Sequence, residues 1–167
     1  MTQQLMDLRN SLLDGRYEDA ITMLDCLEAS NRRTMLHQIE HNLVRFVLPL
    51  IQSQIEQQIT NHLVADLWQS LRNIQKLNRG DSQPTHYINE DEWAPYIEEA
   101  IEDAIRPAAV LVCGGIYSPS SLSEQLDRTL VTLMAQDFLR LTYTNSTKNL
   151  SELVDKRIKQ LPGGEKY

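Results

Sequence analysis

The sequence predicts an all-α protein, a single-domain bundle of about seven helices over residues 1–167. Three observations support this prediction. A chain of 167 residues suits one domain and can bury a core without a metal or disulfide. There are only six Gly and six Pro, and aromatic residues make up 6% of the chain, which favours helices over sheets. Apolar residues recur at every third or fourth position, and no stretch of strand length alternates apolar and polar residues.

A helical hairpin is expected over residues 2–29. Leucines recur at helical spacing in its first half, and Gly15 is suited to end that helix. A second amphipathic stretch follows directly. We expect the apolar residues of both stretches to be buried in the protein's own interior: Leu5, Leu8, Leu12, Leu13, Tyr17, Ala20, Ile21, Leu24 and Leu27.

Two long helices are expected over residues 31–78. Ser30 or Asn31 is suited to cap the first, whose apolar stripe runs across Pro49. Since a proline removes an interior hydrogen bond, we expect a kink near Pro49. The second helix starts from Thr60 or Asn61.

A polar loop is expected over residues 79–89, because this is the only long polar stretch that contains both Gly and Pro. A helix over 90–113 follows it. Asn89 and Glu92 have the spacing of a capping box, and Gly114 with Gly115 ends the helix.

Pro107 predicts a second kink within the helix over 90–113.

Ser118 before Pro119 is a cap followed by a proline at the first helical position, which predicts one helix over 119–144. A last helix over 149–161 is closed by the segment Pro162-Gly163-Gly164.

The net charge of −7 argues against some partners. Seven acidic residues and no basic residue lie between positions 90 and 103, so this segment accounts for the whole excess of negative charge. An acidic chain is repelled by phosphate backbones and anionic membranes, which disfavours binding to either. The exception to weigh is a weak nucleic-acid-binding regulator that would use Arg72, Lys76 and Arg79.

The cysteines and the N-terminus predict a cytoplasmic protein. Cys26 and Cys113 are 87 positions apart in apolar surroundings, so we interpret both as buried thiols in a reducing compartment. The first residues have neither the basic nor the apolar region of a secretory signal. The longest apolar run, residues 46–51, is too short to cross a membrane.

One short motif has the residue types of a metal site. His37, Glu40 and His41 match the H-x-x-E-H string of inverted zinc peptidases, with two imidazoles on one helix face and a glutamate as general base. Such enzymes also need a third zinc ligand, a carboxylate from a following helix, and a sheet edge that aligns the substrate. The sequence predicts no strand that could supply this edge. A zinc-dependent hydrolase is therefore an alternative, and solvated histidines on a helix surface are the preferred interpretation.

The acidic segment is the other candidate site. Glu98 with Glu102 and Glu99 with Asp103 are like-charge pairs four residues apart, which a basic partner would relieve. A solvated helix face is the preferred interpretation, and docking of a basic protein is the alternative. No P-loop, dinucleotide-binding turn or nucleophile elbow is present, so we expect no cofactor.

Several segments of the chain together resemble a known family. They cover residues 1–5, 15–20, 74–78, 92–93, 98–102, 123–124, 127–128, 141–144 and 161–165. These segments keep their order over nearly the whole chain, and they are similar to the cyanobacterial branch of the family catalogued as domain of unknown function 29. The resemblance implies an all-helical cytosolic protein and brings no activity, cofactor or catalytic residue.

The favoured hypothesis for function is a non-enzymatic helical protein that acts through protein–protein interaction or self-assembly. Helix caps, apolar stripes and turn residues explain most positions of the sequence, and no catalytic constellation is left over. Short helices can leave an apolar strip for a partner, so a homo-oligomer is expected.

Overall fold

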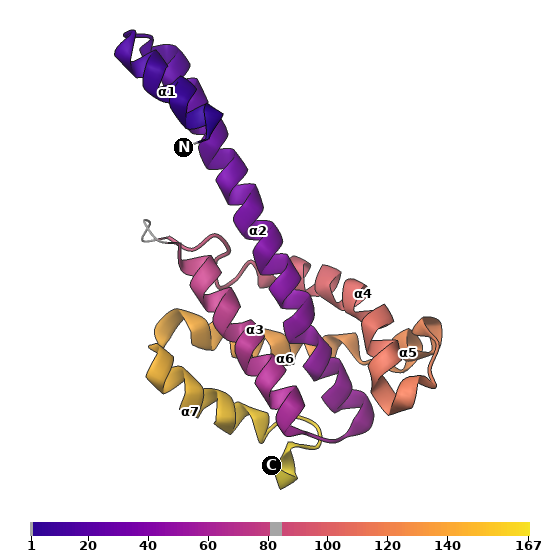
Figure 1. Cartoon of the computed structure of the whole chain (residues 1–167). Coiled ribbons are helices and arrows are strands. Elements are labelled where there is room, and N and C mark those ends of the chain that lie inside the picture. Colours follow the sequence, from indigo (N-terminus) through magenta and orange to yellow (C-terminus); the bar gives the residue numbers. More distant parts are fainter. Residues whose placement is uncertain (1, 81–84) are drawn as a thin grey trace. The chain divides into compact units, whose positions relative to one another are not determined.

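The all-α prediction is confirmed. The computed structural model describes residues 2–80 and 85–167, and in this part of the chain it has seven α-helices, two short 3-10 helices and no strand (Figure 1). None of the helices in the described ranges is both long enough and apolar enough to cross a membrane. The α-helices are α1 (Gln3–Leu13), α2 (Tyr17–Glu56), α3 (Asn61–Arg79), α4 (Trp93–Leu111), α5 (Pro119–Gln125), α6 (Arg128–Thr144) and α7 (Thr147–Ile158); the 3-10 helices are η1 (Val112–Gly115) and η2 (Gly164–Lys166).

The chain divides into two compact units. Residues 1–37 form the first unit, which contains α1 and the N-terminal part of α2. Residues 38–167 form the second unit, which contains the rest of α2 and all later helices. The two units differ in how completely they bury their apolar residues.

The second unit has a closed apolar core. Its central helix is α6, which contacts α3, α4 and α7. Phe46 of α2 meets Phe138 of α6 edge to face, with ring centroids 6.0 Å apart and planes at 81°. The largest side chains of this core are fully buried: Ile39, Leu43, Phe46, Leu50, Ile51, Leu67, Leu71, Ile74, Ile88, Trp93, Ile97 and Phe138.

A polar network joins three helices to the segment before α4. The Tyr143 hydroxyl accepts hydrogen bonds from Trp93 Nε1 at 2.6 Å and from Asn78 Nδ2 at 3.1 Å, and it donates to the Ile88 carbonyl at 2.7 Å. Asn78 also pairs with the Ile88 backbone, donating to its carbonyl at 2.9 Å and accepting from its N–H at 2.8 Å. The network therefore fixes Ile88 in the core.

The C-terminal Gly163 and Gly164 pack where no side chain fits. Gly163 has a φ of 78°, and a Cβ there would lie 2.2 Å from the Gln57 carbonyl carbon, in the link between α2 and α3. A Cβ on Gly164 would lie 2.1 Å from the Ile158 carbonyl oxygen. The two glycines thus have a packing role beyond closing the last helix.

Local signals placed most helix ends correctly. Gly15 has a φ of 73° directly after α1, as its predicted stop role requires. The Thr60 hydroxyl accepts from the Leu63 N–H at 3.2 Å, and the Ser118 hydroxyl accepts from the Ser121 N–H at 3.2 Å. The Asn89 N–H donates to Glu92 Oε2 at 2.9 Å, but the predicted capping box does not open the helix, because α4 begins only at Trp93.

The predicted break at Ser30 or Asn31 is wrong. One continuous helix of 40 residues, α2, runs through both positions and includes Pro49. Residues 28–34 are exposed and polar or small, so they carry no apolar residue whose burial would favour a turn. A residue that can cap a helix does so only where packing on either side requires the chain to turn.

The predicted single helix over 119–144 is also wrong. It is divided into α5 and α6 at Leu126 and Asp127. Asp127 caps α6 by accepting from the Leu130 N–H at 3.0 Å. The side-chain amide of Gln54 in α2 makes two hydrogen bonds to the backbone of Asp127. Its Nε2 donates to the Asp127 carbonyl at 3.1 Å, and its Oε1 accepts from the Asp127 N–H at 2.9 Å. These bonds across 73 positions stabilise the break.

The remaining boundaries differ by a few residues. The helix expected over 90–113 is α4, which includes Pro107 and ends at Leu111. The helix expected over 149–161 is α7, which begins at Thr147 and ends at Ile158. The polar loop expected over 79–89 begins one residue later than predicted, since α3 ends at Arg79, and its residues 81–84 lie outside the described residues.

Candidate functional site

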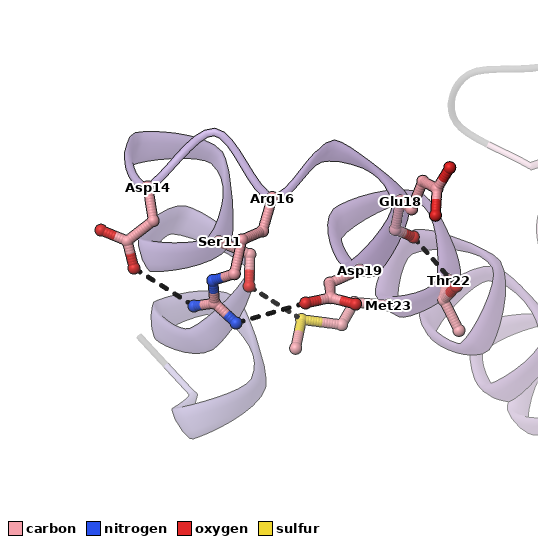
Figure 2. A network of polar contacts seen from close by, with 7 residues as sticks. All are labelled: Ser11, Asp14, Arg16, Glu18, Asp19, Thr22 and Met23. Atoms are coloured by element: carbon pink, nitrogen blue, oxygen red, sulfur yellow. Dashed lines mark hydrogen bonds and ion pairs between the residues drawn. The ribbon is translucent and has the colours of Figure 1, made fainter.

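The first unit is a hairpin held by a narrow seam. The Ser11 hydroxyl donates to the Met23 sulfur at 3.9 Å, and Asp7 and Leu27 line one hollow, so α1 and the start of α2 run antiparallel (Figure 2). Of all residues from 2 to 37, only Leu8, Ser11 and Ala20 are buried. α1 has only 11 residues, and so small a core stabilises a short helix poorly.

The turn of the hairpin is built from charged residues. Arg16 contacts the carboxylates of Asp14 at 3.2 Å and Asp19 at 3.3 Å (Figure 2). All three side chains are more than half exposed, so the two ion pairs add little free energy. The Thr22 hydroxyl donates to the Glu18 carbonyl at 3.0 Å within the helix. The turn is thus a solvated feature held by weak ion pairs.

The expectation that the hairpin buries its apolar stripes is wrong. Leu8 and Ala20 are buried and Leu27 is half-buried. The others have no third helix of the first unit to cover them, because a two-helix hairpin offers each helix only one neighbour. The exposed members of the predicted stripes are Leu5, Leu12, Leu13, Tyr17, Ile21 and Leu24, together with the neighbouring Met6.

Two of the exposed leucines of α1 lie on one side of the seam. A helix turns by about 100° per residue, so Leu5 and Leu12 lie within about 60° of the buried Leu8 and on the side away from Ser11. Met6 lies about 100° further round than Leu5, on the back of the helix. Leu5 and Leu12 therefore border the seam, and Met6 does not.

The exposed residues of α2 repeat this arrangement. Tyr17 and Leu24 lie within about 60° of the buried Ala20, and Ile21 lies about 100° from it, all on the side away from Met23. Because the two helices run antiparallel, the same sense of rotation from the seam leads to the same side of the hairpin. Five side chains thus form one apolar surface, the hairpin face: Leu5, Leu12, Tyr17, Ile21 and Leu24.

The other side of the hairpin has a hollow of about 170 Å³ between α1 and α2. It is lined by Gln4, Asp7, Thr22, Met23, Cys26 and Leu27. The thiol of Cys26 is exposed there, about 200° round the helix from Leu24.

The prediction that both cysteines are buried is wrong. Cys26 lies on α2 where the hairpin has no third helix, and it is exposed. Cys113 is exposed in η1, at a backbone φ of 49°. Its N–H donates to Glu56 Oε1 at 2.7 Å. Apolar neighbours in sequence do not bury a thiol when the helix side or turn that carries it has no packing partner.

The histidine motif lies on α2, with its two imidazoles exposed. His37 and His41 are exposed and Glu40 is half-buried, as expected for residues bordering the apolar stripe. Within residues 2–80 and 85–167, no group of three or more His, Cys, Asp and Glu side chains could hold a metal ion. No third ligand supports the zinc alternative, which stays a sequence-based prediction.

The acidic residues predicted as a docking face are all exposed on α4. Glu98, Glu99, Glu102 and Asp103 point away from its buried side. Glu102 is paired with Arg128 of α6, so a base of the chain's own already relieves part of this charge. The face is therefore a weaker candidate for a basic partner than the charge count indicates.

The basic residues of α3 differ in their environment within the fold. Arg72 donates to the Gln75 side chain, and Gln75 Nε2 donates to the carbonyls of Thr142 at 3.0 Å and Asn145 at 3.2 Å at the end of α6. Lys76 and Arg79 are exposed in the last turn of α3, where positive charge complements the helix dipole. Arg72 is thus engaged within the chain, whereas Lys76 and Arg79 complement the end of the helix.

The hairpin face is thus the site that the sequence analysis missed. All five of its residues belong to the predicted stripes, but they were expected to be internal. The available signal was the width of the apolar stripe on each helix, which exceeds what one neighbouring helix covers. No family model, curated protein or solved structure matches the chain.

Proposed function

We propose that this is a non-enzymatic cytoplasmic protein that binds another protein chain through the hairpin face. The observation that supports the proposal is the imbalance within residues 2–37, where three residues are buried and five large apolar side chains are exposed on one side. Monomeric proteins seldom expose apolar patches larger than a few hundred Å², and larger patches mark interaction sites.

The size of the patch fits a protein partner. Each of the five side chains is between 43% and 65% exposed, which corresponds to about 100 Å² each and roughly 500 Å² in all. A standard interface covers about 800 Å² on each partner, of which about 60% is apolar. The hairpin face therefore supplies the apolar centre of one standard interface, and the surrounding polar residues supply its rim.

The other candidate functions have weaker support. The zinc hydrolase requires a third ligand near His37 and His41, and the described residues offer no such group. The nucleic-acid regulator requires Arg72, whose guanidinium is engaged with Gln75. Docking of a basic protein on α4 competes with the ion pair between Glu102 and Arg128.

Affinity capture from the native cells tests the proposal. The full chain is compared with a Leu5→Glu variant and a matched Met6→Glu control. Leu5 and Met6 are neighbours on α1 with nearly equal exposures of 43% and 46%, but only Leu5 belongs to the hairpin face. We expect the chain bound to the wild type to be lost with Leu5→Glu and retained with Met6→Glu. Equal retention by both variants would contradict the proposal.

A further inference from the structure

We infer that the occupant of the hairpin face is a second copy of this chain, so that two hairpins form an intermolecular four-helix bundle. The inference rests on the proposed function and commits it to one partner. Three observations favour a second copy over a different protein: the form of the face, its charge and its area.

The form of the face suits pairing with itself. Two antiparallel helices side by side, each with a row of apolar residues facing the same way, make half of a four-helix bundle. A two-fold axis brings the same patch of both copies together, so no other surface of the chain is needed. Each helix then gains a second neighbour, and the residues that the hairpin leaves exposed become the centre of a core.

The charge of the hairpin allows this pairing. Residues 1–37 contain four arginines and six acidic residues, whereas the whole chain carries a net charge of −7. Two hairpins therefore meet with only a small excess of like charge. The five residues of the hairpin face are uncharged, so no ionised group has to be buried between the copies. A face made to select a strongly charged partner would have charges of one sign around it.

The area agrees with what a stable dimer needs. Roughly 500 Å² of apolar surface from each copy, with a polar rim, reaches the standard size of about 800 Å² per partner. The small core of the hairpin also favours a dimer, because α1 has 11 residues and buries only Leu8 and Ser11. Helices this short depend on packing for their stability. Pairing supplies the packing that one chain lacks.

The mass of the purified full-length protein in solution tests the inference. We expect sedimentation equilibrium to give twice the mass of one chain at about 100 µM, with dissociation on dilution. Leu5→Glu or Ile21→Glu places a carboxylate in the centre of the interface twice, and each variant should raise the dissociation constant about 30-fold or more. Met6→Glu should change it by no more than about threefold.

A second measurement covers the case in which a charged variant fails to fold. Hydrogen exchange of the wild type is followed while the protein is diluted from about 100 µM to about 1 µM. We expect protection in α1 and in residues 17–27 to fall on dilution, while protection in α4 stays constant. Protection in the hairpin that is independent of concentration would overturn the inference, as would equal effects of Leu5→Glu and Met6→Glu on the dissociation constant.

The two proposals fail in different ways. A wild-type protein that is monomeric at about 100 µM overturns self-association. If native capture then still yields a different protein that Leu5→Glu releases, binding through the hairpin face stands. If Leu5→Glu releases nothing in that capture, both proposals fall.

Discussion

Replacing Tyr143 by phenylalanine removes one oxygen atom from the network that fixes Ile88. In the variant, Asn78 keeps its two bonds to the Ile88 backbone, so this part of the network survives. The indole N–H of Trp93 loses its acceptor and is left in a side chain that is 1% exposed. An unsatisfied buried donor costs about 1–3 kcal/mol, and the lost hydroxyl bonds bring the expected loss to about 2–3 kcal/mol. For a chain of this size the melting temperature should fall by roughly 5–10 °C.

The same variant should change how stability depends on pH. Burial raises the pKa of Tyr143 above its usual 10.0, and hydrogen bonds from Trp93 and Asn78 act in the opposite direction. Because the folded state holds the phenolic proton more tightly than the unfolded state, the stability from this group is complete below pH 10. It is lost as the pH rises from there through the folded pKa. The stability difference between wild type and Tyr143→Phe should therefore narrow above pH 10.

Urea unfolding followed by circular dichroism measures both effects. Tyr96→Phe is the matched control, because Tyr96 lies on α4, touches the Trp93 ring with centroids 6.4 Å apart, and its hydroxyl has no hydrogen bond within the described residues. We expect this control to change the free energy of unfolding by less than about 0.5 kcal/mol. If Tyr143→Phe and Tyr96→Phe destabilise the protein equally, the reasoning about the network is refuted.

Two further predictions concern the backbone. Gly163→Ala should lower the free energy of unfolding by about 3 kcal/mol or more, because the added Cβ would lie 2.2 Å from the Gln57 carbonyl carbon. Gly15→Ala is the matched control. Gly15 has a φ similar to that of Gly163, but a Cβ there would have nothing within 4 Å, so this variant should cost only about 1–2 kcal/mol. Thermal melts of both variants check this, and equal losses would show that the close approach carries no cost. Gln54→Ala removes both hydrogen bonds to Asp127 and should cost about 1–2 kcal/mol in urea unfolding, whereas Gln52→Ala, which loses no such bond, should cost less than about 0.5 kcal/mol. Similar costs for the two glutamine variants would contradict the role given to Gln54.

Helix caps show how much of the fold was accessible from the sequence. Thr60 and Ser118 each bond to a backbone N–H three residues away, so the whole interaction lies within a short window of sequence. The division between α5 and α6 could not be predicted in this way. It is stabilised by Gln54, which meets Asp127 only after the chain has folded.

The candidate site was accessible in part. The apolar periodicity correctly identifies Leu5, Leu12 and Ile21 as members of helix stripes, and this is the reason that they can form a joint face. The same periodicity predicts that these three side chains are buried, and this prediction is wrong because they are exposed. Cys26 was misjudged for the same reason, because its apolar neighbours belong to a hairpin with one seam.

The amino-acid sequence by itself determined that the chain is helical and where most helices begin and end, because those properties depend on residues three or four positions apart. Only the tertiary structure decided which apolar stripes are covered. The stripes of α3 and α4 both meet α6 in the second unit, whereas the hairpin face meets no other helix of its own unit. A stripe records that a helix side gains free energy by leaving water, but the partner that allows this is defined only by positions in space.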